Sequence, residues 1–150
     1  RAYWHCTFFR QAPEHSAAGV NPELSAQITK YMEAQVGPRT YEHQNYHCAN
    51  KLLSYDKTHA YAWVLCQGYT DYPKAMDGSG EGFSVPIRFK YRQPRYSIVA
   101  ANQPGDGSRY TSDVERLFPR ELRDEIEKSQ NQVPALRRQV EAAARKQAGV

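Results

Sequence analysis

Residues 82–92 alternate between apolar and polar side chains, and this alternation restricts the fold more than any other feature of the chain. One parity carries Phe83, Val85, Ile87, Phe89 and Tyr91, and the other carries Ser84, Pro86, Arg88, Lys90 and Arg92. Because successive side chains of a β-strand point to opposite faces, the pattern predicts a half-buried strand with one basic, solvent-facing side. Pro86 cannot donate to a β-ladder, so we expect a sheet edge, a strand start or a bulge there.

Residues 21–36 carry the signals of an amphipathic helix. Asn21 is a suitable N-cap, and Pro22 suits the first helical turn. Leu24, Ile28 and Tyr31 recur at helical spacing, and Gly37-Pro38 stops the helix. Since this apolar stripe is narrow, we expect the helix to lie across a sheet, on the face that carries some of the following residues: Trp63, Leu65, Phe83, Val85 and Phe89.

Three further strands are predicted, over about 40–53, 59–70 and 95–101, and helical segments follow at about 119–130 and 134–147. The order of the elements predicts an α+β domain, with the first helix packed on a curved antiparallel sheet of about four strands and a helical C-terminal tail. We expect residues 1–130 to form this domain and residues 131–150 to form a weakly anchored helix. The layout resembles cystatin-like folds, although the Gln-x-Val-x-Gly hairpin of protease-blocking cystatins is absent.

The chain has three cysteines, Cys6, Cys48 and Cys66. A hairpin that turns about Lys57 places Cys48 directly opposite Cys66, with Leu52–Ala62 and Tyr46–Gly68 as other pairs on the same face. Cα atoms at a non-hydrogen-bonded pair are about 4.5 Å apart, which a disulfide accepts. The register therefore favours a disulfide, which implies an oxidising compartment; two free, buried thiols are the alternative. Cys6 is left as a free thiol, a competitor for one of the other two, or a link to another chain.

A family resemblance rests on an ordered set of short motifs. They are His47-Cys48-Ala49, the segment Tyr61–Cys66, Gly80–Pro86, and Pro104-Gly105-Asp106-Gly107-Ser108 with Tyr110 and Asp113 ahead of Phe118-Pro119. Over about residues 39–120 the set resembles small extracytoplasmic bacterial proteins, often lipoproteins, of no assigned activity. The resemblance implies export and supports the Cys48–Cys66 pairing, and it brings no catalytic residues.

The composition is that of a globular, slightly basic protein. Of 150 residues, 40% are hydrophobic and 12% aromatic, which excludes wholesale disorder, and 20 Lys and Arg against 16 Asp and Glu give a net charge of +4. That excess permits an anionic partner without requiring one. Arg88, Lys90, Arg92 and Arg95 form a possible anion-binding face; an ordinary solvated strand face is the alternative. No nucleic-acid signature accompanies them, and no apolar run reaches the roughly 20 residues of a membrane span.

The residues suited to chemistry do not form a catalytic or metal-binding pattern. His43 and His47 lie on a predicted strand, where a separation of four residues is about 13 Å, too far for one metal ion. The thiols of Cys48 and Cys66 lack a suitably placed histidine, and Gly78–Gly82 lacks the Gly-Lys-Ser/Thr of a phosphate loop. We therefore expect no catalytic residue, no metal and no cofactor.

These observations predict an exported, non-enzymatic binding or structural module of the cell envelope or surface. Its partner would be a protein or an anionic envelope polymer. A small hydrolase or transferase with an unadvertised site is the second hypothesis. A binder of nucleic acid or anionic polymer through the basic strand face is the third.

Overall fold

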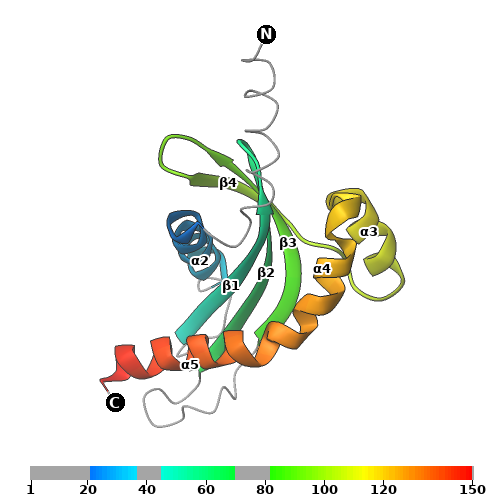
Figure 1. Cartoon of the computed structure of the whole chain (residues 1–150). Helices are drawn as coiled ribbons and strands as arrows, with labels where there is room; N and C mark the ends of the chain where they lie inside the picture. The colour runs from blue at the N-terminus through cyan, green and yellow to red at the C-terminus, as the bar shows by residue number, and fades with distance from the viewer. Residues whose placement is uncertain (1–20, 37–44, 70–81, 150) are drawn as a thin grey trace.

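The computed structural model describes residues 21–36, 45–69 and 82–149. They form the predicted α+β fold: an antiparallel sheet of order β1-β2-β3-β4 with helix α2 on one face and helices α3, α4 and α5 on the other (Figure 1). The elements are α2 (Pro22–Val36), β1 (Asn45–Tyr55), β2 (His59–Tyr69), β3 (Gly82–Arg92), β4 (Ser97–Asn102), η2 (Gly107–Arg109), α3 (Tyr110–Leu117), η3 (Arg120–Leu122), α4 (Arg123–Lys128), η4 (Ser129–Gln132) and α5 (Val133–Ala148). Among these helices, none combines the length and the apolar character needed to cross a bilayer.

Helix α2 begins and packs as its sequence predicts. The side chain of Asn21 accepts a hydrogen bond from the Leu24 amide at 3.0 Å, which satisfies one of the free donors of the first turn. Leu24, Ile28 and Met32 are buried against the sheet. The ring of Tyr31 meets that of Phe89 edge-on, with centroids 6.4 Å apart. The predicted docking of α2 on the sheet is therefore confirmed for Phe89.

Two residues of the expected docking face lie on the opposite side of the sheet. Trp63 and Leu65 belong to the core under α3, α4 and α5, whereas Ala62 and Val64 face α2. The strict alternation of β2 explains the difference, because both parities of this strand are apolar and the sequence alone does not say which parity meets which helix. Phe83 and Val85 lie on the α2 side, as expected, and are partly buried there.

The hairpin register is the one deduced from the cysteines. Cys48 pairs with Cys66, and the expected pairs Leu52–Ala62 and Tyr46–Gly68 are both present. Beyond Leu52 the register shifts by one residue, so that Ser54 faces Tyr61. Before the shift, ordinary strand alternation already places Cys48 and Leu52 in the core under α2 and Ala49 and Leu53 in the core of the other face.

Pro86 lies in the part of β3 that β4 does not reach, so that β3 forms the edge of the described sheet there. It pairs with Trp63 of β2, while the pairing with β4 covers only Arg88 to Arg92. A residue without an N–H is tolerated at such a position because no neighbouring strand needs the donor. The expectation of an edge position is therefore confirmed. Strand β4 begins at Ser97, later than the predicted 95, because Tyr96 adopts a left-handed backbone conformation with φ 51° in the β3–β4 turn.

Helix α5 is more deeply packed than its thin apolar stripe suggests. Leu136, Val140 and Ala144 are 2%, 0% and 0% exposed. They lie in the same core as Trp63, and Figure 1 shows α5 running across the sheet beside β1 and β2. The small alanine side chain allows the helix to approach the sheet closely. That residues 131–150 are weakly anchored stays a prediction, and truncation tests whether the helix is dispensable.

Candidate functional site

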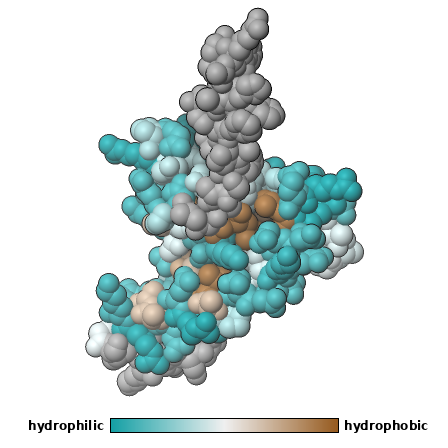
Figure 2. All heavy atoms as spheres, in the orientation of Figure 1, coloured by the Kyte–Doolittle hydropathy of each residue, from teal (hydrophilic) through white to brown (hydrophobic). Residues whose placement is uncertain are grey.

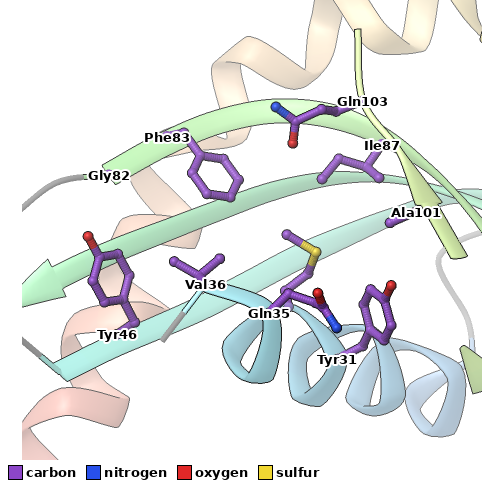
Figure 3. A pocket seen from close by; sticks show the side chains of 10 residues that line it. Tyr31, Gln35, Val36, Tyr46, Gly82, Phe83, Ile87, Ala101 and Gln103 are labelled. Atoms are coloured by element: carbon purple, nitrogen blue, oxygen red, sulfur yellow. The ribbon is translucent and has the colours of Figure 1, made fainter. Parts of the chain in front are cut away.

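A pocket of about 520 Å³ lies between α2 and the sheet. Figure 3 shows that α2 supplies one wall, β3 the opposite wall, and residues near the ends of β1 and β4 the margins. The lining residues are Tyr31, Met32, Gln35, Val36, Tyr46, Gly82, Phe83, Ile87, Ala101 and Gln103. The volume falls in the range of about 300–1,000 Å³ that is typical of small-molecule sites.

The pocket is hollow because two features of the fold remove side chains from this place. Strand β4 ends at Asn102, opposite Arg88, so no residue of β4 covers the part of β3 that carries Phe83. On the neighbouring strand, Gly68 lies opposite Tyr46 and adds no side chain to the α2-facing surface. Helix α2 therefore bridges a depression that the sheet does not fill.

The lining mixes apolar side chains with uncharged polar ones, which include Tyr31, Tyr46 and two glutamines. Met32, Phe83 and Ile87 supply the apolar surface, and the exposed side chains of Gln35 and Gln103 lie at the margin from the helix side and the β4 side (Figure 3). Among the lining residues in the described part of the chain, none is Asp, Glu, His, Lys or Arg. Such a lining favours an uncharged molecule with an apolar body and groups that hydrogen-bond to amides.

The disulfide fixes the sheet beside the pocket. Cys48 and Cys66 are bonded, with Cα atoms 4.1 Å apart, which confirms the predicted pairing. Cys66 of β2 in turn pairs with Phe83 of β3, which lines the pocket. The bond therefore links β1 to β2 next to the strand that forms one wall of the pocket.

Helix α2 is tied to the exposed edge of β1 by polar contacts. Glu33 accepts a hydrogen bond from the Cys48 amide at 2.9 Å. The side-chain amide of Asn50 donates to the carbonyl of Ser25 and to the hydroxyl of Thr29, both at 2.9 Å. These contacts satisfy edge groups of the sheet and hold the wall formed by α2 at a fixed distance from β1.

The predicted anion-binding residues do not line this pocket. Arg88 donates a hydrogen bond to the side chain of Asn102 at 3.2 Å and is partly buried. Lys90, Arg92 and Arg95 are exposed, near the end of β3 and in the turn that follows it. Arg88, Lys90 and Arg92 are alternate residues of β3 and share one side of the strand, and of these three only Arg88 is partly buried.

The remaining candidates of the sequence fall in two groups. His47 lies on β1, buried, with its ring 6.0 Å from that of Tyr69 and its Nδ1 atom 3.9 Å from Glu33 Oε2. Cys6, His43 and most of the glycine loop at 78–82 lie outside the described residues; only Gly82, the first residue of β3, is described. Within residues 21–36, 45–69 and 82–149, no group of three or more side chains is arranged to hold a metal ion.

Sequence reasoning did not find the pocket margin. Gln35 falls at the helical spacing of the apolar stripe, four residues after Tyr31, and Gln103 lies just after a short strand; neither residue belongs to a motif. The only available signal was the alternation that places Phe83 and Ile87 on one face, together with the helix expected above that face.

Comparisons with known protein families, with curated proteins and with solved structures find no match for this chain.

Proposed function

We propose that this protein is an exported binding module of the cell envelope or surface, and that it holds a small uncharged molecule in the pocket between α2 and the sheet. The observation that carries the proposal is the pocket itself, with its lining of apolar and uncharged polar side chains. The Cys48–Cys66 disulfide supports export, because disulfides persist chiefly in oxidising compartments.

The ligand that fits this lining has an apolar body and uncharged polar groups. An aliphatic or aromatic part packs on Phe83, Ile87 and Met32, while hydroxyl, carbonyl or amide groups meet Gln35 and Gln103. A carboxylate or ammonium group placed among these residues would lose its hydration without gaining an opposite charge. The alternative of a small hydrolase or transferase draws no specific support from the lining.

Binding of Nile red, an uncharged dye that fluoresces in apolar surroundings, tests the proposal. We expect saturable binding by the whole chain. Gln35→Trp places a large ring at the margin of the pocket and should abolish that binding. Ala34→Trp adds the same ring at the neighbouring exposed position of α2, which does not line the pocket, and should leave binding intact.

Two outcomes would contradict the proposal: no saturable binding by the folded protein, or equal effects of the two tryptophan substitutions. Melting curves of both variants show that the fold is retained. Because both positions are exposed on the same helix, a general effect of tryptophan on α2 would appear in both variants.

A further inference from the structure

Two turns of the sheet lie side by side at one end of the molecule. The β1–β2 turn contains Asp56 and Thr58, and the β3–β4 turn follows Arg92. The amide of Tyr91 donates to the carbonyl of Thr58 at 2.8 Å, and the hydroxyl of Tyr91 donates to the carbonyl of Asp56. The ring of Tyr91 also packs on that of Tyr96, with centroids 5.6 Å apart. Tyr91 therefore holds both turns in a fixed arrangement.

Exposed basic side chains gather on these two turns. We call this surface the basic tip: Lys57, Lys90, Arg92 and Arg95, all exposed. Lys90 and Arg92 are alternate residues of β3 and so lie on one side of the strand, about 7 Å apart. Figure 2 shows a hydrophilic surface over the β3–β4 turn, at the upper left.

In the two described turns and the adjoining end of β3, the four cations of the basic tip lie near one carboxylate, that of Asp56. Residues 82–105 contain four Arg and Lys and no Asp or Glu, and residues 57–69 contain no acidic residue. In the part of the chain that the structure describes, no ion pair involves a residue of the basic tip. A fixed group of unpaired cations raises the local positive potential and attracts anions.

Asp56 is the one acidic residue in either turn, and its carboxylate is used within the turn. Its Oδ1 atom accepts hydrogen bonds from the amides of Thr58 and His59, both at 2.8 Å. Burial alone would raise the pKa of Asp56, but the hydrogen bonds from Thr58 and His59 outweigh it and lower the pKa. The carboxylate thus stabilises the turn that presents Lys57.

We propose that the basic tip docks on a membrane surface that contains anionic phospholipids. Its cations come from one end of β3 and from the two neighbouring turns, and the pocket between α2 and the sheet includes none of them. An end of this kind meets a flat array of phosphate groups with several cations at once, whereas a polymer chain favours a groove. Val99, the one large hydrophobic residue among those described that is exposed, lies on β4 close to the same turn.

The expected binding is weak, reversible and sensitive to salt. Each Lys or Arg near an anionic bilayer increases binding about fivefold at moderate ionic strength, and salt screens the effect. The test is co-sedimentation of the whole chain with vesicles of equal parts phosphatidylcholine and phosphatidylglycerol, compared with vesicles of phosphatidylcholine alone. We expect binding to the anionic vesicles only, and its loss in high salt.

Charge variants distinguish the basic tip from a general effect of net charge. Changing the four residues of the tip to Gln (K57Q, K90Q, R92Q and R95Q) should reduce binding at least a hundredfold. The matched control (R120Q, K128Q, R138Q and K146Q) removes the same number of positive charges from exposed positions of η3, α4 and α5 and should bind like the unmodified protein. Melting curves and far-ultraviolet circular dichroism verify that both variants are folded.

Equal loss in the two variants, or no binding to anionic vesicles by the unmodified protein, would overturn the proposal. Binding of a single-stranded oligonucleotide through the basic tip, without vesicle binding, would also overturn it and identify a phosphate-bearing polymer as the partner. None of these results depends on the pocket, so this proposal and the proposed function fail separately.

Discussion

Asp56 determines the geometry of the β1–β2 turn. Its Oδ1 atom accepts from two amides and from the hydroxyl of Thr58, and its carbonyl accepts from Tyr91. Asp56→Ala removes the side-chain contacts, and we expect it to lower the free energy of unfolding by about 1–2 kcal/mol at neutral pH, since this carboxylate is only partly buried. Urea unfolding measures the change.

The effect of Asp56 should depend on pH in a defined direction. The pKa of this carboxyl is lowered in the folded state, so its stabilisation is fully present above its ordinary pKa of about 3.9 and is lost as the pH falls through the folded-state value. The difference between the unmodified protein and Asp56→Ala should therefore shrink in acid. Asp56→Asn keeps a hydrogen-bond acceptor but removes the charge. If the difference in the free energy of unfolding between the unmodified protein and Asp56→Ala stays constant with pH, this account is contradicted.

The disulfide is the second feature that depends on individual side chains. Cys48 and Cys66 are separated by 18 residues in the sequence. Replacing both with Ala should reduce the free energy of unfolding by about 2–3 kcal/mol, mainly because the unfolded chain is no longer constrained. Mass spectrometry of non-reduced peptides from the native compartment checks the bond directly. Free thiols at both positions in that material would refute the pairing.

Helix α2 forms a wall of the pocket, and its attachment depends on buried apolar contacts. Ile28 is completely buried between the helix and the sheet. Ile28→Ala should lower the free energy of unfolding by about 2–4 kcal/mol, because it leaves a cavity in a closely packed core. Lys30→Ala, on the exposed side of the same helix, is the control and should change stability little. A loss below about 0.5 kcal/mol for Ile28→Ala would mean that α2 is peripheral.

Helix α5 covers the opposite face of the sheet, and its removal measures how much the helix contributes to the free energy of unfolding. Truncation after Gln130 removes the buried side chains of Leu136 and Val140, so we expect a loss of about 3–6 kcal/mol and a lower melting temperature. Leu136→Ala in the whole chain should cost about 2–4 kcal/mol, while the exposed Arg138→Ala should cost little. A truncated protein that keeps its melting temperature and its oligomeric state would show that α5 is accessory, as the sequence suggested.

At the scale of the whole molecule, local patterns predicted the elements, and long-range packing determined the sites. The alternation over residues 82–92 predicts β3 correctly, and the cysteine positions predict the β1–β2 register. These signals are local or depend on one pairing. The pocket could not be predicted in the same way, since it brings together residues from α2, β1, β3 and β4 that the sequence does not link. Of the basic tip, the sequence grouped Lys90, Arg92 and Arg95, and it did not place Lys57 beside them. Lys57 lies near Lys90 because His59 pairs with Lys90 in the β2–β3 ladder and Tyr91 contacts the β1–β2 turn.

The central claim is that a small uncharged molecule binds between α2 and the sheet, and amide chemical-shift mapping by NMR tests it most directly. Nile red titrated into the labelled whole chain should shift the amide signals of Met32, Phe83, Ile87 and Gln103, and leave those of α5 beyond Val140 in place. Shifts confined to α5 or to the basic tip, or spread without preference over the surface, would contradict the claim.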